Sequence, residues 1–190
     1  MTRQRLQQAG TAWHPLVSGN PPVWASAWGQ DEYGVWVEFT LAEVSPRLRW
    51  IPAGAFDMGS PDDEPGRFER EGPRHRVVIR QGYWLFATPV TQALWRAVMG
   101  ENPSRFQSPD RPVERVSWED CQAFLGAING AMPGLDLILP SEAQWEYACR
   151  AGEPGALYTG ALDIQGDANA PALDPRSEER RVGKECRSRW

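Results

Sequence analysis

The chain contains one lysine, Lys184, two histidines and three cysteines among its 190 residues. No run of eighteen apolar residues occurs, which excludes a membrane-spanning helix. No apolar stretch follows Arg3 and Arg5, which argues against a secretory signal and for a cytoplasmic protein. The net charge is −5 and no basic face stands out, so we expect neither nucleic acid nor a membrane as a partner.

The few cysteines and histidines limit the chemistry that the chain can carry. Cys121 and Cys149 lack C-x-x-C spacing and fall on apolar helix faces, so we predict buried free thiols. His14 and His75 do not sit at metal-ligand spacing, and we expect His75 to make a structural hydrogen bond. These residues assemble no Cys–His or Ser–His–Asp catalytic set.

Glycine, proline and tryptophan are abundant, with 18 Gly, 17 Pro and ten Trp. High Gly and Pro content indicates many turns, and the tryptophans indicate large flat side chains that fill the core between them. This composition disfavours a long helical bundle and predicts an α+β domain with little regular secondary structure.

Alternation of apolar and polar residues predicts strands. In 34–41 the inward series is Val35, Val37 and Phe39; further strands are expected at 48–51 and 75–80, with Tyr83–Leu85 extending the sheet. The remaining segments are interpreted as irregular: a loop at 1–30, a turn at 52–54 from which Phe56 and Met58 lead out, and a surface loop at 60–73.

Three helices are indicated by capping signals and apolar spacing. The first begins after Thr91 and ends at Gly100, with Leu94, Trp95, Val98 and Met99 inward. The second begins after Ser117, with Asp120 completing a capping box, and stops at Gly130; its apolar face is Cys121, Phe124, Leu125 and Ile128. The third begins after Ser141 and closes at Gly152, with Trp145, Ala148 and Cys149 inward.

Acidic groups give weak site candidates. The run Asp62, Asp63, Glu64 can offer oxygen ligands to calcium, although such runs are more often simply solvated, and the turn 166–169 is a slightly better calcium candidate. Glu142 and Glu146 lie one helical turn apart, and capping and surface ion pairs explain them adequately.

The segment Arg176–Trp190 differs from the rest of the chain. It holds six basic and three acidic residues, whereas residues 1–175 contain fourteen Arg and no Lys. The string resembles the translation of a common short-read sequencing adapter. We interpret 176–190 as a non-native tail, with a natural basic tail as the alternative.

Five motifs, in order across 48–152, resemble the formylglycine-generating enzyme (sulfatase-modifying factor) family. They are WIPAGAFDMGS at 50–60, EGPRHRV at 71–77, PVTQALW at 89–95, PVERVSWED at 112–120 and LPSEAQWEYA at 139–148. The resemblance implies a C-type-lectin-like α+β fold, present here only in part. It divides the chain into an N-terminal extension (1–47) with a strand, the first part of the domain (48–175), and the tail (176–190).

The resemblance also implies a function. The best-known member of the family oxidises a cysteine of a protein to formylglycine with molecular oxygen and a copper ion held by a cysteine pair. Relatives use iron, act in siderophore maturation, or display variable ligand-binding surfaces. We therefore expect a fragment of such an oxidoreductase, with a protein or small thiol as substrate; the alternative is a non-catalytic lectin-like binding module.

The chain departs from the family pattern at several points. The G-N-x-x-E-W motif near the catalytic cysteines does not occur, so the catalytic half is expected to be absent. The resemblance places a calcium ion near an A-N element, which makes Asn169, with Ala170, the metal-ligand candidate. Ser141 replaces Thr and keeps the cap, while Ile138 replaces an Arg, which either removes a buried charge contact or reflects a subfamily.

Overall fold

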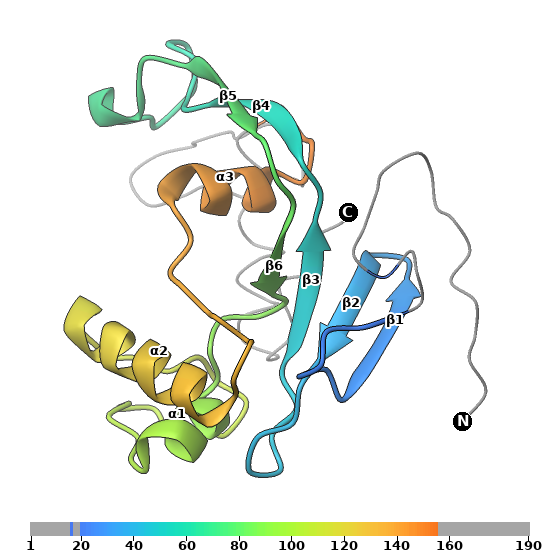
Figure 1. Cartoon of the computed structure of the whole chain (residues 1–190). Helices are drawn as coiled ribbons and strands as arrows, with labels where there is room; N and C mark the ends of the chain where they lie inside the picture. Colours follow the sequence, from blue (N-terminus) through green and yellow to red (C-terminus); the bar gives the residue numbers. More distant parts are fainter. Residues whose placement is uncertain (1–15, 17–19, 156–190) are drawn as a thin grey trace. The chain divides into compact units, whose positions relative to one another are not determined.

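The structure, a computed structural model, describes residue 16 and residues 20–155. The chain divides into two compact units. Unit 1 comprises Met1–Pro52 and Tyr83–Leu139, and unit 2 comprises Ala53–Gly82 and Pro140–Trp190. Figure 1 follows the described elements from β1 to α3 along the sequence colours.

Unit 1 contains an antiparallel four-stranded sheet in the order β1-β2-β3-β6. Its strands are β1 (Ala27–Asp31), β2 (Gly34–Glu38), β3 (Arg47–Ile51) and β6 (Tyr83–Phe86). The strands predicted near 34–41 and 48–51, and the extension of the sheet at Tyr83, are confirmed. The loop predicted over residues 1–30 is wrong at β1. This strand has no buried residue, and it forms because it pairs with β2 through a tight hairpin.

The core of unit 1 joins the sheet to two helices, α1 (Gln92–Met99) and α2 (Trp118–Ala131). Trp95 of α1 stacks on Phe124 of α2 with ring centroids 5.0 Å apart and an interplanar angle of 3°. The inward series predicted for β2 is confirmed. The buried residues of the unit 1 core are Leu16, Val35, Val37, Phe39, Leu48, Leu94, Trp95, Phe124, Ile128 and Leu135.

The predicted helix caps are confirmed. Thr91 and Ser117 accept hydrogen bonds from the backbone N–H groups of Leu94 and Asp120, and Asp120 completes the capping box of α2. The predicted stop at Gly130 is wrong, because the Met132 N–H still donates to Ile128 and the helix continues through Ala131. Pro133 follows and has no N–H to extend the hydrogen-bond ladder.

Unit 2 contains a two-stranded antiparallel sheet of β4 (Gly54–Met58) and β5 (His75–Ile79), a 3-10 turn at Glu69–Glu71, and helix α3 (Glu142–Arg150). The α3 capping box of Ser141 and Gln144 is confirmed. The predicted inward face of α3 is partly wrong, because Trp145 is 58% exposed and Tyr147 is buried instead. The Tyr147 ring packs on Phe56 of β4, with centroids 5.3 Å apart, and this contact sets the rotation of the helix.

An ion pair lies on the sheet of unit 1. Arg49 is buried and donates two hydrogen bonds to the Asp31 carboxylate, at 2.6 and 2.9 Å. Partial burial raises the pKa of Asp31, but the hydrogen bonds from Arg49 and the Tyr33 backbone N–H, with the charges of Arg49 and Arg47, outweigh it. The pKa of Asp31 therefore lies below its usual value.

Asp31→Asn is expected to lower the free energy of unfolding at pH 7 by about 1–2 kcal/mol, since solvent screens the partly exposed carboxylate. A depressed folded-state pKa stabilises the fold above the unfolded-state pKa, at about pH 4, and this contribution disappears as the pH falls through the folded-state pKa. Urea unfolding at several pH values from 7 to 3 measures this effect. The free energy of unfolding should fall less steeply with decreasing pH for the variant than for the wild type. Asp110→Asn, at an exposed residue, is the control, and its free energy of unfolding should vary with pH as in the wild type. The same pH dependence in all three proteins would contradict a stabilising role for the Asp31–Arg49 ion pair.

Candidate functional site

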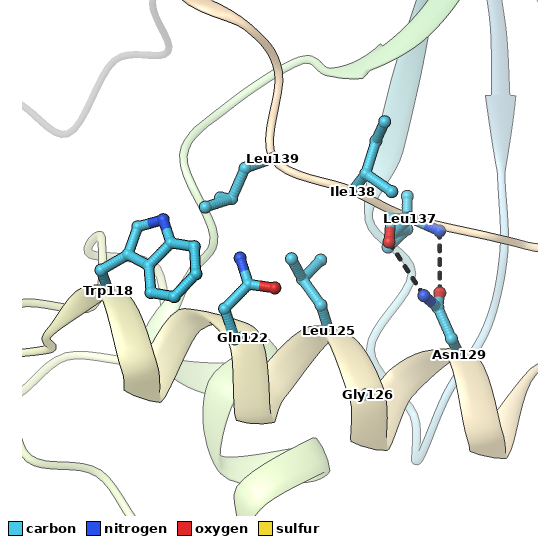
Figure 2. Close-up of a pocket in the computed structure, with 8 residues that line it drawn as sticks. All are labelled: Trp118, Gln122, Leu125, Gly126, Asn129, Leu137, Ile138 and Leu139. Atoms are coloured by element: carbon cyan, nitrogen blue, oxygen red, sulfur yellow. Dashed lines mark hydrogen bonds between the residues drawn. The ribbon is translucent and has the colours of Figure 1, made fainter.

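A groove on unit 1 is the candidate site. It has a volume of about 430 Å³ and lies between α2 and the segment 137–139. Figure 2 shows the α2 side chains pointing toward that segment. The residues that line it are Trp118, Gln122, Leu125, Gly126, Asn129, Leu137, Ile138 and Leu139.

Helix α2 forms one wall of the groove, because one side of the helix packs into the core and another side faces the groove. Phe124 and Ile128 are buried in the core, whereas Trp118, Gln122 and Asn129 lie on the side that faces the groove. The capping box fixes the first turn and therefore the position of Trp118. The hydrogen bonds from the backbone N–H and the hydroxyl of Ser117 lower the pKa of Asp120, so this cap stays ionised to a more acidic pH than an ordinary aspartate would.

The second wall is held in place by Asn129. Its carboxamide donates to the Leu137 carbonyl and accepts from the Leu137 N–H, both at 2.8 Å (Figure 2). This pair of bonds satisfies both backbone polar groups of Leu137, much as a neighbouring strand would. Ile138 and Leu139 remain exposed along the groove, with 77% and 39% of their surface accessible to solvent.

The chemistry of the groove is that of binding. Its lining combines an indole, four aliphatic side chains and two carboxamides, and includes no titratable side chain. Such a surface can hold apolar groups and form a few directed hydrogen bonds. It offers no nucleophile and no general acid or base.

A second cluster, in unit 2, is structural. The Glu146 carboxylate accepts from the Gly59 N–H at 2.9 Å and from Arg150 Nε at 2.8 Å, and Arg150 donates to the Gly59 carbonyl at 3.0 Å. Ion pairing thus explains Glu146, as expected from the sequence. The cluster joins α3 to the turn after β4.

The cysteines and the described histidine occupy separate places. Cys121 lies on α2 and Cys149 on α3. The prediction of burial is wrong for Cys149, which is exposed, while Cys121 is partly buried. The structural hydrogen bond predicted for His75 is confirmed, because its Nδ1 lies 2.9 Å from the Pro73 carbonyl oxygen.

Of the calcium candidates, only the acidic run 62–64 lies within the described residues. Within 20–155, no three Cys, His, Asp or Glu side chains lie close enough together to hold a metal ion. In the acidic run, Asp62 pairs with Arg67 at 2.7 Å. His14, the turn 166–169, and the metal-ligand candidates Asn169 and Ala170 lie outside the described residues and stay predictions.

The sequence did not reveal the groove, although it singled out Ile138. That side chain is exposed on the second wall, so it fills no buried position in unit 1. Two of the lining residues carried a usable signal, because Gln122 and Asn129 lie off the predicted apolar stripe of α2. Trp118 lies beside that stripe, and the expectation that it packs in the core is wrong, because it is 65% exposed. In addition, no helix in the described part of the chain has the length and hydrophobicity that crossing a bilayer requires.

Comparison with known proteins shows how far this architecture is shared. The chaperone protein LppX of Paenibacillus barcinonensis is 28% identical over 75% of this chain and 65% of its own length. The formylglycine-generating enzyme of Bos taurus is 37% identical over 47% of this chain and 21% of its own length. The structure of PvdO from Pseudomonas aeruginosa matches 73% of this chain and 59% of that chain, with 25% identity and a TM-score of 0.58. The chain thus spans less than two thirds of these relatives.

The family comparison covers most of the chain. The sulfatase-modifying factor enzyme 1-like domain matches residues 39–181, a range that takes in all five motifs found in the sequence. The fold is the α+β fold of this family, as the sequence predicted, with mixed strands and few helices. The chain belongs to the sulfatase-modifying factor enzyme 1-like (formylglycine-generating enzyme) domain family.

Proposed function

We propose that this chain is part of a protein that oxidises a cysteine residue to formylglycine with molecular oxygen, and that residues 20–155 supply the scaffold rather than the reacting groups. One observation carries the proposal. Gly59 belongs to the first family motif and Glu146 to the last, and the two are joined by a hydrogen bond and by Arg150. The motif residues thus hold the fold that the family shares.

The proposed metal is copper held by a cysteine pair. The described residues do not fit such a site, because neither Cys121 nor Cys149 belongs to a group of three or more metal-binding side chains among them. No step is therefore assigned to these thiols. The proposed substrate is a protein or a small thiol, and the proposed location is the cytoplasm.

The test uses the protein expressed from the intact gene. A cysteine-containing peptide is incubated with it, copper and oxygen, and the product is read by mass spectrometry and by capture of the aldehyde with a hydrazide. We expect an aldehyde product that needs both oxygen and copper, and none from a peptide with serine in place of cysteine. A folded protein that binds copper but forms no aldehyde would refute the proposal.

A non-catalytic binding module is the second candidate. The observation that favours it is the groove on α2, whose lining can bind a ligand but has no group that reacts. The match to LppX, which covers more of this chain than the match to the bovine enzyme does, is consistent with it. Ligand binding without oxygen consumption or aldehyde formation would support this candidate over the first.

A further inference from the structure

One asparagine in the described part of the chain is followed directly by glycine. Asn129 precedes Gly130 in the last turn of α2, whereas Asn20 and Asn102 each precede a proline. The backbone nitrogen that follows an asparagine can attack its side-chain carbonyl carbon, and glycine favours this because it has no Cβ in the way. Proline has no N–H, so the reaction is closed at Asn20 and Asn102. Asn129 is therefore the reactive carboxamide among the described asparagines.

The closed helix blocks this reaction. In an α-helix the N–H of residue 130 donates to the carbonyl of residue 126, which holds the nitrogen of Gly130 away from the side chain. The Asn129 carboxamide is held as well, by its two hydrogen bonds to Leu137 at 2.8 Å (Figure 2). The nitrogen can attack only after the last turn of α2 has opened.

The last turn of α2 is weakly held. Gly126 and Gly130 provide the acceptor and the donor of the same helical hydrogen bond, and glycine weakens a helix relative to alanine. Both are exposed, and a Cβ built on either would meet nothing within 4 Å outside the adjacent helix backbone. The helix ends at Ala131, and no basic residue in the last turn offsets the helix dipole. Because helix ends fray, this turn opens without unfolding of the core.

We propose that Asn129 is a deamidation site that becomes reactive when the last turn of α2 opens, and that its acidic product releases the segment 137–139 from the helix. The nitrogen of Gly130 bonds to Cγ of Asn129, and the bond from Cγ to the amide nitrogen breaks. The backbone proton leaves with that nitrogen as ammonia. Water then opens the cyclic imide and leaves a carboxylate. The reaction needs neither a metal nor a cysteine, so this inference is independent of the catalytic proposal.

The product cannot hold the second wall of the groove. The amide nitrogen of Asn129 donates to the Leu137 carbonyl, whereas a carboxylate in its place only accepts hydrogen bonds. Its negative oxygen repels the carbonyl oxygen, and the new charge near the C-terminus of α2 also opposes the helix dipole. Ile138 and Leu139 thus lose the anchor that keeps them along the groove.

Peptide mapping by mass spectrometry follows the reaction in the full chain. The protein is incubated at mildly alkaline pH, both folded and in urea, and the acid formed at each asparagine is measured over time. We expect acid to accumulate at Asn129 in the folded protein, more slowly than in urea, and not at Asn102. No acid at Asn129 in folded samples taken long after the unfolded protein is fully converted would overturn the proposal.

Gly126→Ala tests the opening of the last turn. It strengthens the helix and leaves the Asn–Gly pair unchanged, so deamidation of the folded protein should slow by about fivefold while the rate in urea stays the same. Asp31→Asn is the control, since it weakens the ion pair on the sheet and leaves α2 intact, and it should not change the rate. An unchanged folded rate in Gly126→Ala, or a faster one in Asp31→Asn, would overturn local opening as the controlling step.

Asn129→Asp reproduces the product and tests the release of the segment. Hydrogen exchange of the N–H groups of residues 137–139 should become at least tenfold faster, while exchange in α1 stays unchanged. Gln122→Glu is the matched control, because it makes the same change from amide to acid on the same wall without a bond to Leu137. Unchanged exchange at 137–139, an equal increase in the control, or an equal increase in α1 would overturn the proposed release.

Discussion

Trp95→Ala is expected to lower the free energy of unfolding by about 3–5 kcal/mol, the largest effect we predict for a single substitution. The side chain is 4% exposed and stacks on Phe124, so alanine leaves a cavity between α1 and α2. Because domains of this kind are stable by about 5–15 kcal/mol, the loss takes a large share of the total. Denaturant unfolding followed by near-ultraviolet circular dichroism measures it.

Trp118→Ala is the matched control, since this indole is 65% exposed. It removes the same side chain from the surface of α2 and should cost about 1 kcal/mol or less. Comparable losses from the two substitutions would contradict the assignment of Trp95 to the core.

Gly59→Ala should also be strongly destabilising, by about 2–5 kcal/mol, because two costs add. Gly59 has a φ of +90°, which an alanine adopts only with strain, and its Cβ would collide with the carbonyl oxygen of Glu71. That carbonyl accepts the Ser60 N–H at 3.2 Å, and Gly59 itself bonds to Glu146 and Arg150. Thermal unfolding and urea titration give the loss.

Gly152→Ala separates the two costs within the same unit. Gly152 has a φ of +85°, but nothing lies within 4 Å of its Cβ. Only the backbone strain remains there, so we expect a loss of about 1–2 kcal/mol. If Gly59→Ala and Gly152→Ala lower the free energy of unfolding by the same amount, the carbonyl of Glu71 does not constrain the turn at Gly59.

The helix starts and the family motifs could be predicted because their signals are local. A serine or threonine cap bonds to a backbone N–H three residues further on, so Thr91, Ser117 and Ser141 indicate their helices without knowledge of the rest of the chain. The alternation in β2 likewise marks its buried face. The order of the five motifs then identified the family.

Other features depend on partners that the local sequence pattern does not reveal. β1 became a strand through its pairing with β2, and β4 through its pairing with β5, although neither shows a clear alternation. The inward face of α3 follows from the contact of Tyr147 with Phe56, which left Trp145 outside. The α2 groove arises only when Asn129 holds Leu137 beside the helix.

The sequence by itself determined where the three helices begin, which residues of β2 lie inside, and the family to which the chain belongs. Each of these rests on contacts between residues a few positions apart, or on an ordered set of short motifs. Only the tertiary structure decided which indoles are buried, where the cysteines lie and that a groove exists on α2. Burial and cavity shape depend on which distant segments pack together, and composition and spacing leave that choice open.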